Sequence, residues 1–405
     1  MLFSDRRGER GIGVVLAVLA FGTFVVGTSE LVIAGILPLV AADLAVSVPA
    51  AGQLVTVYAL SFGVGAPVFA ALLGGTPFSV KTRILGLLAV FLGGSAAGAL
   101  APSYGWLLGA RVVTACAAGT FEVFATSGAA ALVAPEKRGR AIALIVSGFS
   151  VALIVGVPLG TLIGAALGWR ATFWALAAMG ALTLTGTWLF FPRTSTTDRL
   201  EPSPVASSSS GFGAVLGALR RPGVGWAFAA TGLLFTGQYV VGTYFAPLLT
   251  TRAGLDASGV AVALLLLGVG SAAGNVLGGS GADRWGIRRT AVFSLLGLAA
   301  AHAALASLGT APLPAAIGMT LVGLTIGGFL PGWQHHLLVR APGLAEVALA
   351  LNLTALNAGV ALGAFVGGIA FDAVGLRWLG FLSAAIVLLA VPAAVFATRR
   401  QPGPA

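Results

Sequence analysis

Three ionisable side chains, Glu30, Arg111 and Glu122, interrupt long apolar runs of the chain. Glu30 precedes Pro38 by about 12 Å of helix, and Arg111 lies about 9 Å inside the start of its own run. The two charges therefore lie at similar depth, and the spacing predicts that they can pair. A carboxylate that alternates between Arg111, a proton and a substrate would suit proton coupling. The alternative is a fixed ion pair that only joins two helices.

Glu122 follows Arg111 on the same run, close to the same helical face and about 16 Å further along. This distance is too long for Glu122 to be the partner of Arg111. Its aromatic neighbours are Phe121 and Phe124. An acid among aromatic side chains suits a cationic or polar substrate, or a second proton. The alternative is a protonated acid that is hydrogen-bonded to a neighbouring helix.

The elements that carry these side chains are predicted to be membrane-spanning helices. Of 405 residues, 58% are hydrophobic and only 8% are charged, whereas a soluble domain carries about 25% charged residues. A spanning helix needs about 20 mostly apolar residues. By that measure the predicted spans are 12–37, 51–74, 84–101, 106–133, 139–166, 169–191, 223–249, 257–280, 289–309, 313–338, 346–370 and 376–398. The fold class expected is an all-α membrane protein of twelve transmembrane helices.

One long polar stretch, residues 192–222, interrupts this pattern, and its Ser, Thr and Pro content is typical of a flexible linker. It divides the chain into an N-terminal six-helix half (1–191) and a C-terminal six-helix half (223–405). Two pseudo-symmetric halves are the hydropathy pattern of a repeat transporter.

The basic residues predict an orientation and argue against nucleic-acid binding. They fall between the apolar runs rather than on one face or arm. Only Arg170, Arg252 and Arg377 lie in the expected outer loops, which predicts that both termini are cytoplasmic. The single cysteine, Cys116, excludes an intrachain disulfide. No metal motif, nucleotide loop or nucleophile–base arrangement appears, so neither a cofactor nor an enzymatic activity is expected.

Several further residues are candidates for binding or packing. Polar side chains that could line a central cavity are Gln238, Tyr239, Asn352 and Asn357. His302 stands alone in an apolar run and is interpreted as a packing residue. The fourfold spacing of Gly156, Gly160 and Gly164 predicts a ridge of small residues that admits a close helix, and Pro158 is expected to kink that helix.

Four motifs resemble those of the major facilitator superfamily, and in particular its bacterial drug:proton antiporters and sugar-efflux-like permeases. They are GTSELVIAGILP at Gly27–Pro38, similar to chloramphenicol exporters; Arg111 with Gly119; GVPLG at Gly156–Gly160, similar to the antiporter motif; and GGSGADRWGIRR at Gly278–Arg289. The resemblance covers nearly the whole chain. It implies two rocking halves and proton exchange as the energy source.

The last motif has a counterpart at Leu73–Arg83 that keeps the glycines and basic residues but lacks the aspartate. In the family this aspartate helps to lock the halves together on the cytoplasmic side. The resemblance therefore implies that the second copy carries more of the lock here. Its residues are Asp283, Arg284, Gly286 and Arg288.

The sequence thus predicts a proton-coupled exporter of drugs or other small organic compounds in a bacterial cell membrane. Its expected partners are a small-molecule substrate, protons and the lipid bilayer, and the expected state is a monomer. The alternatives are a sugar or metabolite exporter on the same scaffold and a transport-inactive membrane sensor. The buried acids argue against a sensor, which has no need of titratable charge.

Overall fold

The structure is a computed structural model that describes residues 5–192 and 217–399. Within those ranges every regular element is helical, and twelve helices are long and apolar enough to cross a membrane. The predicted all-α fold with twelve spans is therefore confirmed. Most of the expected linker lies outside the described residues, so the domain boundaries at 191 and 223 stay a prediction.

The first six spans are built from nine helical segments, and a short 3₁₀ turn precedes the fifth span. The segments are α1 (Asp5–Leu31), α2 (Ile33–Asp43), α3 (Val48–Gly74), α4 (Val80–Ala99), α5 (Tyr104–Ala131), α6 (Arg138–Val151), the π-helical turn η2 (Ala152–Gly156), α7 (Val157–Leu167) and α8 (Trp169–Phe190), with the 3₁₀ turn η1 at Pro135–Lys137.

The second six spans are built from seven helices. They are α10 (Val224–Gly242), α11 (Phe245–Ala253), α12 (Ala257–Trp285), α13 (Ile287–Leu308), α14 (Pro312–Arg340), α15 (Ala345–Val374) and α16 (Leu376–Ala397). The polar gap before α12 ends in Asp256, whose carboxylate accepts a hydrogen bond from the Gly259 N–H and so caps the helix.

Tight glycine turns join α7 to α8, α12 to α13 and α15 to α16. Gly168, Gly286 and Gly375 have φ of 87°, 81° and 82°, a region of backbone space in which side chains other than glycine are strained. Gly168 and Gly375 occupy the same place in the two halves, before the sixth helix of each. These turns explain why the sequence shows such short polar gaps at these points.

Two spans of the first half are irregular where the candidate chemistry lies. The first span is interrupted at Val32, between α1 and α2, two residues after Glu30. The fifth span contains the π-helical turn η2 between α6 and α7. Such turns in a helix occur frequently at functional sites.

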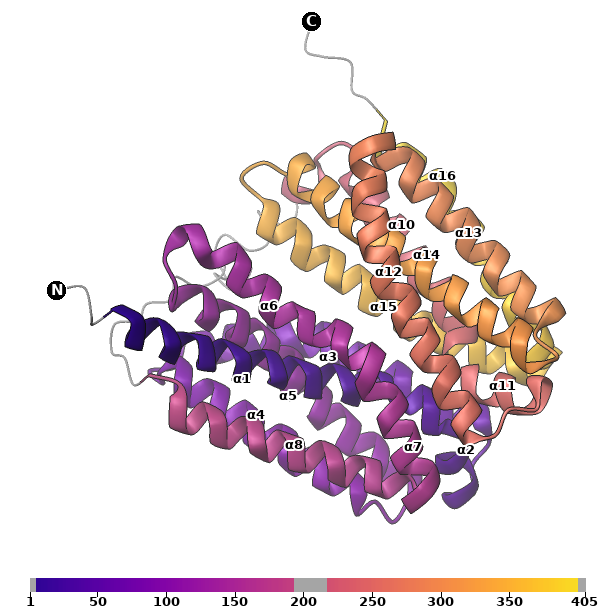
Figure 1. The fold of residues 1–405 in the computed structure, drawn as a ribbon, viewed down its shortest axis with the longest axis horizontal. Coiled ribbons are helices and arrows are strands. Elements are labelled where there is room, and N and C mark those ends of the chain that lie inside the picture. Colours follow the sequence, from indigo (N-terminus) through magenta and orange to yellow (C-terminus); the bar gives the residue numbers. More distant parts are fainter. Residues whose placement is uncertain (1–4, 193–216, 400–405) are drawn as a thin grey trace, which may run out of the picture.

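The two halves form separate bundles that converge at one end of the molecule and diverge toward the end that holds both chain termini (Figure 1). Where they converge, α3 packs along α15, α12 packs along α7 and η2, and α11 packs against α2. Gly52 of α3, for example, lies directly against the phenol of Tyr244. The interface between the bundles is therefore closed at the α2/α11 end.

An ion pair fastens the same end within the first half. Arg170 binds the carboxylate of Asp43, and Trp169 Nε1 donates to Asp43 Oδ2 over 3.1 Å. The hydrogen bond from Arg170 holds the pKa of the Asp43 carboxyl below its usual range. Both side chains remain well exposed.

Candidate functional site

Glu30 occupies the last turn of α1, beside the interruption at Val32, and its side chain is half-buried. Arg111 of α5 donates to the carbonyl of Ser29, the residue before Glu30, and α5 also carries Glu122. Within the described ranges, however, no ion pair or hydrogen bond joins Glu30 to Arg111, so the predicted pairing is not made in this conformation. Glu30 is therefore a carboxyl group beside a residue that holds a buried guanidinium, without being bonded to that guanidinium itself.

Arg111 is completely buried and is held by the backbone of α1. Its Nη1 donates to the Ser29 carbonyl oxygen at 2.8 Å and to Ser29 Oγ at 3.3 Å. The guanidinium carbon lies 3.9 Å from the ring centroid of Tyr58, a cation–π contact from α3. Its Nε and Nη2 have no hydrogen-bond partner among the described residues. A buried guanidinium with two unused donors can bind another acceptor when one comes within reach.

Glu122 is half-buried on α5, the helix that also carries Arg111. The sequence predicted the two at different depths of this helix, and no hydrogen bond or ion pair joins them among the described residues. Tyr239 of α10 belongs to the second half and packs against Gly363 of α15. The first half therefore holds Glu30, Arg111 and Glu122, and the second half holds Tyr239.

The two phenylalanines near Glu122 belong to the core of the first half. Phe121 is fully buried, and its ring tip lies 2.5 Å from where a Cβ on Gly22 of α1 would be. Phe124 is also buried and lies 5.5 Å from the guanidinium of Arg83. The structure therefore places both predicted cavity aromatics in helix packing.

Gln238 lies in a buried polar network rather than at the Glu30 site. Its Oε1 is 2.9 Å from His302 Nε2, and His302 Nδ1 is 3.1 Å from Ser383 Oγ. The Ser383 hydroxyl in turn donates to the carbonyl of Gly237. This network, the His302 network, joins α10, α13 and α16. His302 is a packing residue, as interpreted from the sequence, but one with two specific partners.

Asn352 belongs to a second network that joins α10, α14 and α15. The Thr231 hydroxyl donates to Asn352 Oδ1 at 2.7 Å, and Trp333 Nε1 donates to Thr231 Oγ1 at 3.1 Å. Asn357 differs because it lies at the interface of the halves, against Gly63 of α3. Its Oδ1 is buried without a partner, so of the predicted amides Asn357 is the one that keeps an unused acceptor.

The glycine ridge of the fifth span packs against the first span, one residue per turn. Gly156 lies directly against Thr28 Oγ1. A Cβ on Gly160 would lie 2.5 Å from Val32, and one on Gly164 would lie 2.7 Å from Ile36. Pro158 is the second residue of α7, in its first turn after η2. The ridge therefore grips the segment that carries Glu30, on both sides of the interruption at Val32.

The predicted lock residues cluster at the turn between α12 and α13, at the end where the bundles diverge. Asp283, Arg284, Gly286 and Arg288 are all exposed. No ion pair of Asp283 is seen among the described residues. The equivalent turn of the first half lies between α3 and α4. There Lys81 Nζ donates to the Trp188 carbonyl oxygen at 2.7 Å, and Arg83 Nη2 donates to the Thr76 carbonyl oxygen at 2.8 Å.

Comparison with known proteins identifies this architecture. The sequence profile of the Major Facilitator Superfamily matches residues 19–345. The chain belongs to this superfamily. Its relatives include an uncharacterized MFS-type transporter, YtbD of Bacillus subtilis, at 35% identity over 91% of both chains. They also include a chloramphenicol resistance protein of Streptomyces lividans, at 34% identity over 96% of this chain and 98% of the relative.

A structural comparison also finds a solved transporter with a similar fold. The nucleoside transporter NupG superposes with a TM-score of 0.76 over 96% of this chain and all of NupG, at 12% identity. This likeness concerns the fold alone. This member of the superfamily is thus a multi-pass membrane protein whose family transports small molecules, and its relatives are transporters rather than enzymes.

Two site residues escaped the sequence analysis. Ser29 supplies both acceptors for Arg111, and Tyr58 supplies the ring beneath its guanidinium. Ser29 lies next to Glu30 in the chain, so its place in the motif was a usable signal. Tyr58 gave none, because the helix on which it lies shows no charge or motif that would place it beside Arg111.

Proposed function

We propose that this transporter is a proton-coupled exporter of small organic compounds in a bacterial cytoplasmic membrane, with both termini cytoplasmic. One observation carries the proposal. Glu30 is a half-buried carboxyl at a helix interruption, next to Ser29, which holds the buried guanidinium of Arg111 with two of its donors unused. A titratable group at the interface of two moving halves can exchange a proton with a different side in each state.

The unused donors of Arg111 provide the other half of the cycle. In the present conformation Nε and Nη2 are unpartnered and Glu30 is free of Arg111. A small shift of α1 relative to α5 would let a deprotonated Glu30 take these donors, since a charge-assisted pair is stronger than a neutral hydrogen bond. Protonation of Glu30 would then release it. Proton binding and the position of α1 would thereby become coupled.

The direct test uses purified protein in liposomes with an imposed pH gradient. Chloramphenicol is the first compound to try, because a relative is a chloramphenicol resistance protein. Glu30→Gln is expected to abolish concentrative transport while exchange at equal concentrations persists. Glu136→Gln, at an exposed acid in η1, is the matched control and should transport normally. Pump-like accumulation by Glu30→Gln would overturn the proposal.

We also propose residues 1–191 and 223–405 as the rocking units and the exposed Asp283 cluster as their lock. The bundles diverge at the end that holds the α12/α13 turn, so this conformation would correspond to the open state of the proposed lock. Asp283→Asn should enlarge the population of the conformation in which the bundles diverge at the α12/α13 turn. Asp372→Asn should not, because Asp372 lies near the C-terminal end of α15, at the other end of the molecule. Accessibility of single cysteines in a Cys116→Ala background measures the shift. Equal labelling in both variants would contradict the lock.

A further inference from the structure

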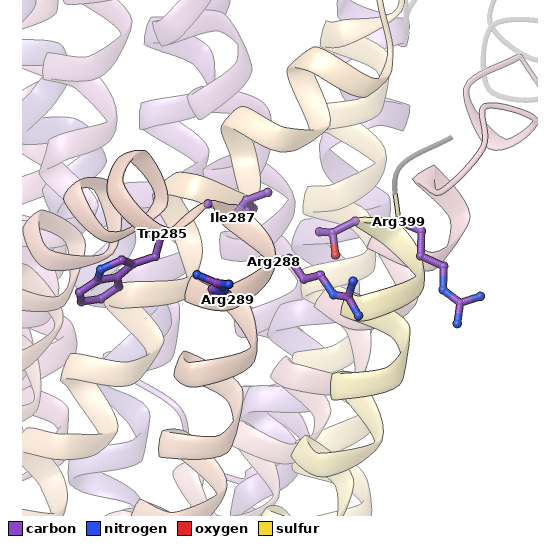
Figure 2. Close-up of a pocket in the computed structure, with 7 residues that line it drawn as sticks. Trp285, Ile287, Arg288, Arg289 and Arg399 are labelled. Carbon is purple, nitrogen blue, oxygen red and sulfur yellow. The ribbon is translucent and has the colours of Figure 1, made fainter. Parts of the chain in front are cut away.

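A pocket of about 800 Å³ lies where α12 turns into α13, beside the end of α16 (Figure 2). Gly286 makes the turn, and the walls are Trp285, Ile287, Arg288, Arg289, Thr398 and Arg399. Figure 2 shows Arg288 and Arg289 at the start of α13 and Arg399 just past the end of α16. Three arginines from two helices thus line one hollow, with their guanidinium groups standing apart around it.

The charge of this pocket is unbalanced. No carboxylate lines it, and among residues 5–192 and 217–399 no acid forms an ion pair with Arg288, Arg289 or Arg399. A fourth arginine, Arg340, donates to the Arg399 carbonyl at 2.6 Å and adds to the positive charge nearby. The first N–H groups of α13 also open here, and helix N-termini favour anions. An anion with several oxygen acceptors therefore fits the pocket.

The equivalent turn of the first half shows the contrast. There Lys81 and Arg83 donate to backbone carbonyls of Trp188 and Thr76. Those basic groups have acceptors from the protein itself. Among the described residues, the guanidinium of Arg399 stacks on the ring of Phe396, 4.1 Å from its centroid, and has no acidic partner.

Apolar surface continues directly from the pocket. Phe293 follows Arg289 by one helical turn and is 63% exposed, and Leu296 continues the same face. Trp285 is 60% exposed at the rim, and exposed tryptophan is typical of the membrane–water boundary. In a membrane protein such faces are covered by acyl chains. One class of ligand joins an anionic phosphate to acyl chains, and that is an anionic phospholipid.

We propose that Arg288, Arg289 and Arg399 bind the phosphodiester headgroup of an anionic phospholipid, with its acyl chains along Phe293 and Leu296. Basic pockets between helices on the cytoplasmic side have this chemistry, and arginine matches the geometry of phosphate oxygens. The site is distinct from the Glu30 site and does not depend on the proposed export activity.

The test measures lipid retained by full-length protein in native mass spectrometry. After incubation with phosphatidylglycerol or phosphatidylcholine in detergent, the wild type should retain phosphatidylglycerol preferentially. The double variant Arg289→Gln/Arg399→Gln should retain it at least about tenfold more weakly. The control Arg252→Gln/Arg377→Gln removes two arginines from the opposite end of the helices and should behave as the wild type.

A competition arm distinguishes the two sources of phosphate. Inorganic phosphate and glycerol 3-phosphate lack acyl chains and should not displace phosphatidylglycerol at millimolar concentration. Displacement by either would assign the pocket to a soluble phosphate and overturn the lipid proposal. Equal retention of phosphatidylglycerol by the double variant and the wild type would overturn it as well, as would equal retention of the zwitterionic lipid.

Discussion

Arg111 in the first half is fully buried, yet two of its donor nitrogens have no partner among the described residues, and neighbouring Glu30 is not bonded to it. His302 in the second half is equally buried, yet both of its ring nitrogens have partners, in Gln238 and Ser383. An unsatisfied buried polar group is costly, whereas a satisfied network makes the packing of its helices more specific. Around Arg111 the first half thus leaves buried donors unpaired, whereas around His302 the second half uses its polar groups to join helices.

The largest effect expected from this contrast concerns Glu122. Glu122→Gln keeps the size of the side chain but removes its charge. Export of a cation such as ethidium should weaken by roughly 2–5 kcal/mol, or at least about thirtyfold, as for loss of one partner of a buried charge pair. Export of uncharged chloramphenicol should continue, and thermal stability should not fall. Transport of each compound by the same liposome preparation is the measurement.

Two other results would reassign Glu122. Loss of both compounds would place it in the proton path. If neither compound is affected, or if the wild type exports no cation, Glu122 has no part in substrate selection.

The next largest effect concerns stability in the second half. His302→Ala leaves Gln238 Oε1 without its partner and removes the acceptor or donor for Ser383, so unfolding should become easier by about 1–3 kcal/mol. Turnover per folded molecule should change little. Denaturation in detergent and initial transport rates measure the two quantities. The control is Thr185→Ala, because Thr185 is exposed and bonds only within its own helix. A stable His302→Ala protein that cannot transport would place His302 in the mechanism.

The hydrogen bond of the second network is expected to contribute less. Trp333→Phe keeps an aromatic ring but removes the N–H that donates to Thr231, and this lost bond should cost about 0.5–1.5 kcal/mol of stability, to which the volume removed at this buried position adds. If Asn352 acted in substrate binding through this network, the apparent KM would rise; we expect it to stay constant. Trp226→Phe changes an exposed tryptophan in the same way and serves as the control.

The smallest effect lies at the closed end, where Asp43 binds exposed Arg170. Because the folded-state pKa of Asp43 is lowered, its contribution is present above the unfolded pKa of about 4 and is lost as pH falls through the folded value. Asp43→Asn should therefore be less stable at pH 7 by a few tenths of a kcal/mol, typical of an exposed pair. The difference from wild type should vanish in acid. A difference that grows as the pH falls would contradict this assignment.

The fold could be predicted because its determinants are local. Apolar runs of sufficient length, short gaps with glycine and the placement of basic residues all lie in adjacent sequence. The networks could not be predicted, because Gln238, His302 and Ser383 meet only when three distant helices pack. Gln238 and Asn352 were therefore assigned to the cavity by their polarity alone. A buried histidine without a visible partner was a signal that such partners had to exist.

The match between the ridge Gly156, Gly160, Gly164 and the side chains Thr28, Val32 and Ile36 has a mechanical meaning. Each of these side chains packs over one glycine of the fifth span. If the first span slid along the axis of the fifth, each side chain would clash with the larger residues beside its glycine. We therefore expect the first and fifth spans to move together as one rigid unit. This unit contacts the second half where Gly268 of α12 meets the backbone of Leu153 and Ile154 in η2. Because Glu30 lies on the same unit, under the proposed function a rotation about this contact would change which side of the membrane reaches Glu30.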